Sequence, residues 1–274
     1  MATNDLSAAL ARLTAQRTRL QAGPALPQVS RDSLFDDFSL RQAHATTALE
    51  GNTLTLDEVQ AVLERGITIP GKSLREHLEV LNAYDTWRWL RPLAQASVPV
   101  TESLVLDIHR RLMQRLLDDD MLGVYRRVPV YIRGSSHLPP NWLEVPDLVA
   151  SWLGRYGGAP GGEHPVTFAA RAHVALVRIH PFVDGNGRTT RMLVNFLLMQ
   201  QGYPPAHYAA EARDAYLGAL RAFDASQDPT ACILVTAEAV GWMMDRWLAL
   251  MDQLAPREGS DTPTTGLPNP PRGL

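Results

Sequence analysis

The chain has 274 residues, and its 26 Lys and Arg against 29 Asp and Glu give a formal net charge of −3. Apolar residues make up 45% and charged residues 20%, the balance of an ordinary soluble globular protein. No run approaches the ~20 apolar residues of a membrane-spanning helix, and the N-terminus lacks the pattern of a secretory signal. Cys232 is the single cysteine, which excludes a disulfide framework. Mild acidity also argues against nucleic-acid binding. We therefore expect a cytoplasmic protein with no membrane partner.

Helical periodicity runs through most of the chain. Leu6, Leu10 and Leu13 open a first apolar stripe that ends near Gly23. Later helices are predicted over about 33–50, 55–65, 73–90, 101–117, 144–153, 166–179, 188–201 and 229–254. The helix at 55–65 is expected to open with a capping box from Thr55 to Glu58.

One short segment alternates like a strand, at Val128 to Arg133, and residues 134–136 supply a turn after it. We therefore expect an all-α fold with one small β-hairpin. Three parts are predicted: an N-terminal helical region at 1–95, a core at 96–254, and a tail at 255–274. The tail is rich in Pro, Gly, Ser and Thr and is expected to be disordered.

Residues 66–73 (GITIPGKS) match the phosphate-loop pattern G-x-x-x-x-G-K-[ST]. That loop requires a buried strand before it and a parallel sheet around it. A helical pattern, LDEVQAVLER, precedes Gly66 instead, and no alternation of strands and helices follows. We interpret residues 66–70 as a connection between two helices. If a phosphate loop were present, Lys72→Ala would abolish ATP use.

The most informative segment is residues 179–191 (IHPFVDGNGRTTR), a short loop that leads into the N-terminus of a helix. Gly185 and Gly187 allow backbone N–H groups to approach an anion closely, and the helix dipole favours negative charge there. Arg188 and Arg191 lie three residues apart and project to the same side. Two guanidinium groups beside free N–H groups predict a site for a di- or triphosphate.

Two further residues of the loop add chemistry to this anion site. Asp184 offers the hard oxygen ligand that Mg²⁺ takes from a protein when phosphates supply the other ligands. His180, at the end of the preceding helix, is placed to accept a proton near neutral pH. A base, a metal ligand, an anion site and paired cations within twelve residues indicate a site that carries chemistry.

The same segment fills every fixed position of H-P-F-x-[DE]-G-N-G-R-x-x-R, and the chain thereby resembles the Fic family over about residues 33–253. The resemblance implies a Fic fold whose catalytic core lies at 96–254. It also implies a protein adenylyltransferase, which transfers AMP from ATP to a Ser, Thr or Tyr hydroxyl of a target protein with Mg²⁺. Self-modification, removal of AMP from a target and homodimer formation occur among such proteins.

The resemblance assigns roles to individual residues. His180 would be the general base, and Asp184 would hold Mg²⁺. The nucleotide phosphates would be bound by Gly185, Asn186, Gly187, Arg188 and Arg191. The adenine would lie near Asn195, Tyr216 and Leu217, although Asp224 stands where an Asn is expected.

Two more elements follow from the resemblance. Residues 46–51 (TTALEG) match the inhibitory pattern [ST]-x-x-x-E-[GN], so Glu50, at the end of a helix over about 33–50, would bind Arg191 and exclude the γ-phosphate. The hairpin with Val130, Tyr131 and Ile132 would be a flap that docks the target as an added strand. Two alternatives stay open: a Fic-fold transferase with another donor, such as UMP or phosphate, and a non-catalytic nucleotide-binding interaction module.

Overall fold

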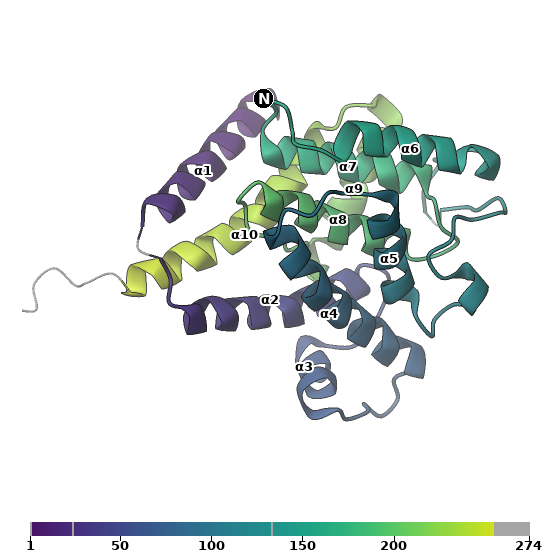
Figure 1. Cartoon of the computed structure of the whole chain (residues 1–274), viewed down its shortest axis with the longest axis horizontal. Helices are drawn as coiled ribbons and strands as arrows, with labels where there is room; N and C mark the ends of the chain where they lie inside the picture. Colours follow the sequence, from purple (N-terminus) through teal and green to yellow (C-terminus); the bar gives the residue numbers. More distant parts are fainter. Residues whose placement is uncertain (1, 24, 133, 255–274) are drawn as a thin grey trace, which may run out of the picture.

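The computed structural model describes residues 2–23, 25–132 and 134–254, and within them the fold is all-α (Figure 1). These residues form ten α-helices and three short 3₁₀ helices, and they contain no strand. The α-helices are α1 (Ala2–Ala22), α2 (Gln28–Ala48), α3 (Leu56–Arg65), α4 (Leu74–Gln95), α5 (Glu102–Met113), α6 (Val145–Tyr156), α7 (Pro165–Ile179), α8 (Asn186–Gln200), α9 (Arg213–Ser226) and α10 (Thr230–Leu254).

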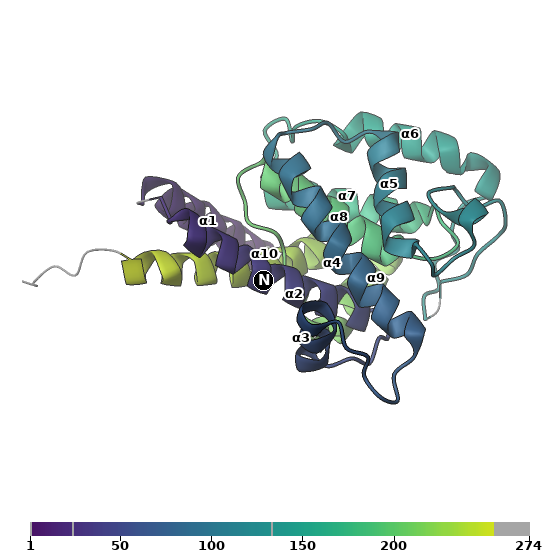
Figure 2. The ribbon, with the colours of Figure 1, turned by 60° about the horizontal axis from the view of Figure 1, so that its bottom comes forward.

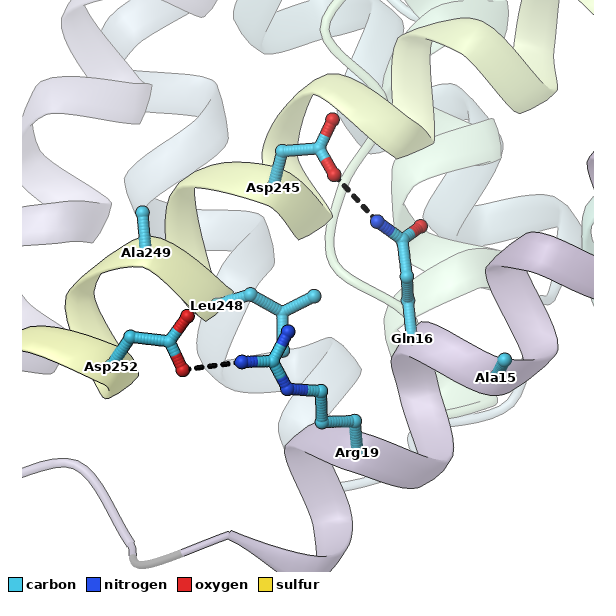
Figure 3. A pocket seen from close by; sticks show the side chains of 7 residues that line it. All are labelled: Ala15, Gln16, Arg19, Asp245, Leu248, Ala249 and Asp252. Atoms are coloured by element: carbon cyan, nitrogen blue, oxygen red, sulfur yellow. Dashed lines mark hydrogen bonds and ion pairs between the residues drawn. The ribbon is translucent and has the colours of Figure 1, made fainter. Parts of the chain in front are cut away.

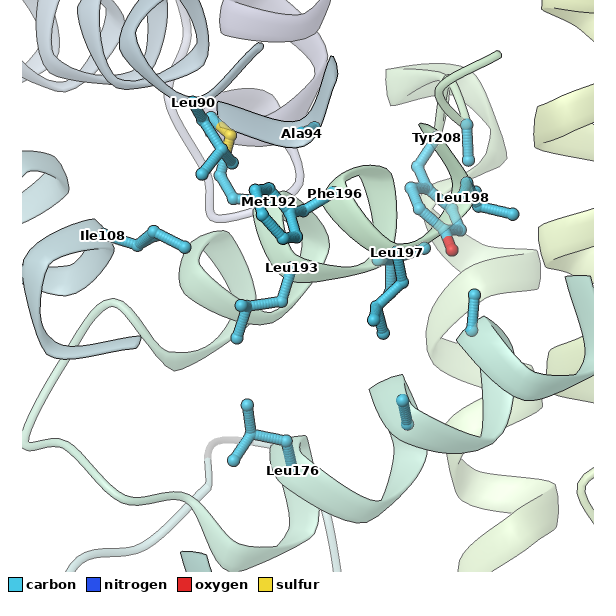
Figure 4. Close-up of a cluster of buried hydrophobic side chains, with 14 of the residues drawn as sticks. Leu90, Ala94, Ile108, Leu176, Met192, Leu193, Phe196, Leu197, Leu198 and Tyr208 are labelled. Carbon is cyan, nitrogen blue, oxygen red and sulfur yellow. The ribbon is translucent and has the colours of Figure 1, made fainter. Parts of the chain in front are cut away.

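Helix α8 lies at the centre, with α4, α5 and α7 packed around it. Its residues are buried on every side from Asn186 to Leu198, which is the pattern of a helix enclosed by others. Figure 4 shows Leu193 and Phe196 of α8 beside Leu176 of α7 and Leu90 of α4. Because the apolar part of α8 anchors it in the core, its polar N-terminus is held in a fixed position.

Helices α1 and α10 pack side by side and extend beyond the central group, with α2 close to them (Figures 1 and 2). A hollow of about 390 Å³ lies between α1 and α10 (Figure 3). Its polar groups are already paired: Gln16 Nε2 donates to Asp245 Oδ1 at 2.5 Å, and Arg19 Nη2 donates to Asp252 Oδ1 at 2.5 Å. It contains none of the predicted site residues.

The predicted helices are confirmed, with one helix omitted and several boundaries shifted. Helix α4 ends five residues after its predicted end, and α5 ends four residues before its predicted end. Helix α2 begins at Gln28, five residues before the predicted start. Helix α9 was not predicted, because only Tyr216 and Ala219 on it are fully buried and Gly218 lies in its middle. The spacing of Tyr216, Leu220 and Phe223 is the signal that could have identified it.

The match to a phosphate loop is a helix connection, as predicted. Gly66 ends α3 in the left-handed conformation at φ 65°, and the predicted capping box of Thr55 opens that helix. Ser73 forms a second capping box at the start of α4. Lys72 Nζ donates to Thr53 O at 2.6 Å, so the lysine of the pattern is bonded to the backbone.

The predicted hairpin is not present as paired strands in the described part of residues 124–141; Arg133 lies outside it, as does the tail at 255–274. A turn closes where Ser135 N donates to Ile132 O at 3.2 Å. Pro129, Pro139 and Pro140 remove the N–H donors that a ladder between the two arms would need. No helix among the described residues is long and apolar enough to cross a bilayer.

Candidate active site

The loop between α7 and α8 is held in shape by its own residues. His180 ends α7 in the left-handed conformation at φ 50°, and Gly185 precedes α8 at φ 75°. The side chain of Asn186 accepts from Phe182 N and donates to Phe182 O, both at 2.9 Å. A Cβ on Gly185 would also lie 2.6 Å from Met113 Sδ, so both its conformation and its surroundings require glycine.

Aromatic stacking supports this loop from below. Phe182 is fully buried and stacks on His109, with ring centroids 3.8 Å apart. His109 accepts from Gly123 N at 3.0 Å and donates from Nε2 to Asp184 O at 3.2 Å. Burial lowers the pKa of His109 to about 4, so the ring is neutral at pH 7. Phe182 therefore anchors the loop in the core, and the support that His109 gives to Asp184 was not predicted.

A buried arginine ties the loop to the segment after α5. Arg126 donates from its backbone N to Pro181 O and from Nε to His180 O, both at 2.8 Å. It also donates to Val128 O at 3.2 Å and to Pro140 O at 2.6 Å, and so joins both arms of the segment at 128–140. No local pattern distinguishes Arg126 from its neighbour Arg127, so the sequence gives no signal for this role.

His180 has the properties of a base. Its Nδ1 donates to Val177 O at 3.2 Å, which leaves Nε2 as the acceptor. Burial lowers the pKa of His180 below its ordinary value, so the ring is neutral at pH 7 and can accept a proton.

The predicted inhibitory contact is present at the end of α2. Arg191 is buried, and its Nη2 donates to Glu50 Oε1 at 2.6 Å and to Thr46 O at 2.9 Å. Its Nε donates to Thr46 Oγ1 at 2.9 Å, and its Nη1 donates to Tyr216 OH at 3.3 Å. Burial raises the pKa of Glu50, but the charges of Arg191 and Arg188 outweigh this and lower it, so Glu50 is ionised.

Glycine at position 187 makes this contact possible. A Cβ there would clash with Glu50 Oε1 and would lie 2.9 Å from Arg191 Nη1. The carboxylate of Glu50 therefore lies against the N-terminus of α8, where the helix dipole and Arg191 both favour negative charge.

A second cluster of charges surrounds Asp184. Its Oδ1 accepts from Gly185 N at 2.6 Å and from Arg188 Nη2 at 3.1 Å, and its Oδ2 accepts from Arg75 Nη2 at 2.8 Å. Burial raises the pKa of Asp184, but these partners lower it below its ordinary value. Arg188 is buried, with Nη1 3.5 Å from Glu79 Oε1, and its Nε and Nη1 have no hydrogen-bond partner among the described residues.

A cavity of about 780 Å³ opens over the loop, which is the size of a small-ligand site. Its lining includes the charged or titratable side chains of Glu50, His180 and Asp184. It also includes apolar side chains, those of Val174, Val177, Leu217, Leu220 and Phe223. Asp224 lines the cavity too, where it pairs with Arg178 and accepts from Ser135 Oγ at 3.0 Å.

The structure brings most predicted site residues together. The cavity is lined by His180, Asp184, Gly185, Asn186, Gly187, Glu50, Tyr131 and Ile132, and the side chains of Arg188 and Arg191 lie behind the loop. Asn195 and Tyr216 do not line it. Asn195 is fully buried and accepts from Ala206 N at 2.8 Å, and the Tyr216 hydroxyl lies between Arg191 and His173.

Comparisons with known proteins agree with this site. Residues 99–198 match the model of the Fic/DOC family. The chain is 35% identical over 215 residues to "Protein adenylyltransferase Fic" of Drosophila willistoni, covering 76% of this chain and 41% of that protein. The chain thus spans well under half the length of this curated relative.

Solved structures give the same fold. Fic-1 from C. elegans superimposes with a TM-score of 0.82 at 27% identity, covering 92% of this chain and 74% of that chain. A Fic domain containing signaling protein from Bacteroides thetaiotaomicron gives a TM-score of 0.75 at 28% identity, covering 89% of this chain and 96% of that chain. The sequence match, the fold and the filled motif at 180–191 together show that this chain carries a domain of the Fic/DOC family.

Proposed function

We propose that the protein is an adenylyltransferase that transfers AMP from ATP to a Ser, Thr or Tyr hydroxyl of a target protein and is inhibited by its own Glu50. The observation that carries the proposal is the position of a neutral His180 on a nucleotide-sized cavity that ends at the N-terminus of α8. The Drosophila willistoni relative, which is named a protein adenylyltransferase, supports the same activity.

In this mechanism, the target hydroxyl oxygen attacks the α-phosphorus as His180 Nε2 accepts its proton. The bond from the α-phosphorus to the bridging oxygen breaks, and pyrophosphate leaves. A positioned base of this kind contributes about 10²–10⁴-fold to the rate. The backbone N–H groups at the start of α8 and the guanidinium of Arg188 would stabilise the negative charge on the phosphates.

Asp184 is the residue that would hold Mg²⁺. The described residues contain no cluster of three or more His, Cys, Asp or Glu side chains that could hold a metal ion. A lone carboxylate beside the anion site fits a magnesium ion whose other ligands are phosphate oxygens and water. When bound, Mg²⁺ would neutralise charge on the phosphates.

The contact between Glu50 and Arg191 accounts for inhibition. Arg191 is the guanidinium that would bind the γ-phosphate, and Glu50 already occupies it at 2.6 Å. Two anions compete for the same N–H groups, so the carboxylate must move before the triphosphate is held productively.

The segment at 128–140 would dock the target. Tyr131 is 84% exposed although it lines the cavity, and Leu138 is 69% exposed. Among the described residues, the backbone groups of Val130 and Tyr131 have no hydrogen-bond partner. A target segment could therefore add to this edge as a strand and present its hydroxyl to His180.

The test uses the full chain with Glu50→Gly, Mg²⁺ and ATP labelled at either the α- or the γ-phosphate, with self-modification or a candidate target as the readout. We expect label from the α-position only, and its loss in Glu50→Gly/His180→Ala. Label from the γ-position alone would identify a phosphate donor. Nucleotide binding without any transfer, from ATP or from UTP, would identify an interaction module and contradict the proposal.

A further inference from the structure

The start of α4 carries a contact that the proposed mechanism does not use. Arg75 lies in the first turn of α4, and its Nη2 donates to Asp184 Oδ2 at 2.8 Å across 109 residues of chain. The other oxygen, Oδ1, accepts from Gly185 N and from Arg188 Nη2. Both oxygens of the carboxylate that would hold a cation are thus occupied by N–H donors.

The donors on Asp184 differ in how freely they can leave. Arg188 is only 2% exposed and enclosed by the core, and Gly185 belongs to the loop backbone. The side chain of Arg75 is 51% exposed, so it can move without disturbing the packing. The guanidinium of Arg75 therefore holds one of the two lone pairs of Oδ2 and repels a cation that approaches this oxygen.

The displaced guanidinium has an anion within reach. Arg75 Nε already donates to Glu79 Oε1 at 3.2 Å, four residues further along the same helix. Glu79 is held in place by Asn52 Nδ2, which donates to its Oε2 at 3.0 Å. Asn52 lies two residues after Glu50, so the groups around the cation position and the inhibitory turn are connected.

We infer that Arg75 competes with the divalent cation for Asp184 and thereby weakens metal binding at the nucleotide site. The inference rests on the proposed function, because it places the metal of the nucleotide on Asp184. Arg75 is a positioning residue in this account, since it acts through Asp184 and not on the substrate.

The test measures Mn²⁺ binding by electron paramagnetic resonance on the full chain, in the presence of a saturating non-hydrolysable ATP analogue. The Glu50→Gly protein is compared with Glu50→Gly/Arg75→Ala. A half-exposed ion pair contributes about 0.2–1 kcal/mol, so removal of Arg75 should tighten Mn²⁺ binding roughly 1.4- to fivefold. Arg19→Ala in the same background is the matched control, because Arg19 forms a similarly exposed pair with Asp252 outside the site.

Unchanged or weaker Mn²⁺ binding in the Arg75→Ala protein, with intact binding of the analogue, would overturn the inference and leave the proposed function standing. Failure of both proteins to bind the analogue in a calorimetric titration would remove the proposed function and the inference with it. Thermal unfolding of each variant shows whether the fold is retained.

Discussion

The two charged contacts at the site differ in depth and in what their release requires. Arg191 is 1% exposed and is bonded by Glu50, Thr46 and Tyr216 from two different helices. The contact of Arg75 with Asp184 has a single hydrogen bond between two side chains that are 51% and 41% exposed. Release of the Glu50 carboxylate leaves Arg191 bonded to Thr46 and Tyr216, whereas a change of rotamer frees Arg75 from Asp184. In the proposed mechanism the first contact would switch activity, and the second would only adjust metal affinity.

The largest effect should come from a residue that belongs to neither contact. His180→Ala in the Glu50→Gly background should lower transfer of AMP by about 10²–10⁴-fold, because no other neutral base replaces Nε2. Rates of label incorporation from α-labelled ATP measure the loss. His137→Ala is the control, because His137 also lines the cavity but donates to Arg178 O. A similar loss in both variants would contradict the assignment.

Removal of the Glu50 carboxylate should have the next largest effect on the transfer rate. If the inhibited state is favoured by about 3 kcal/mol, Glu50→Gly should raise the transfer rate by about 150-fold. Glu50→Gln, which keeps the shape but not the charge, should give a smaller rise. Glu64→Ala on α3 is the control. Equal rates in the wild type and Glu50→Gly would refute the inhibitory role.

A neutral histidine supports each contact, so the stability of both regions should depend on pH. His109 lies under Asp184 with a pKa of about 4, and His173 bonds Tyr216 behind Arg191 with a pKa of about 3. Burial lowers both values below 6.5, so the unfolded chain binds more protons below that pH. Stability is therefore full above about pH 6.5 and falls as the pH is lowered.

Urea unfolding measures this dependence. At pH 5 each histidine should reduce the free energy of unfolding by about 2 kcal/mol relative to pH 7. His109→Asn or His173→Asn should lower the free energy of unfolding at pH 7. Each should also reduce the difference in that free energy between pH 7 and pH 5 by about 2 kcal/mol. The same pH dependence in the wild type and in both variants would show that these rings are not neutral in the folded protein.

A smaller effect on the transfer rate should come from Thr46, which binds Arg191 beside Glu50. Thr46→Val removes the acceptor of Arg191 Nε and weakens the inhibited state by about 1 kcal/mol, which should raise the transfer rate roughly fivefold. Thr47→Val is a matched control, since Thr47 is equally buried but its hydroxyl donates only to Ala43 O and His44 O within α2. A rise no larger than that of Thr47→Val would leave Glu50 as the sole inhibitory group.

Sequence predicts well those parts of this molecule in which the residues that determine a structure lie close together in the chain. The loop at 180–191 is one, because glycines, helix start and arginines fall within one motif. Contacts across long stretches gave no local signal: Arg75 reaches Asp184 across 109 residues, and Arg126 reaches His180 across 54. Tyr216 was predicted to bind nucleotide, and its hydroxyl accepts from Arg191; a pattern does not reveal which way a helix faces.

Sequence also left the backbone pairing of the segment at 128–140 undetermined. The alternation of Val128, Val130 and Ile132 predicted a hairpin, but alternation concerns side chains alone, and the described residues of the segment contain no paired strands. Pairing needs backbone N–H donors on both arms, and the prolines lack them. The side chain of Arg126 joins the two arms instead.

In the proposed mechanism, Glu50 occupies the position of the γ-phosphate on Arg191. Calorimetric titration of a non-hydrolysable ATP analogue and of ADP into the wild type and Glu50→Gly at fixed Mg²⁺ tests this most directly. We expect Glu50→Gly to tighten binding of the triphosphate more than binding of the diphosphate, because only the triphosphate carries the competing group. An equal change for both nucleotides, or no change for either, would contradict it.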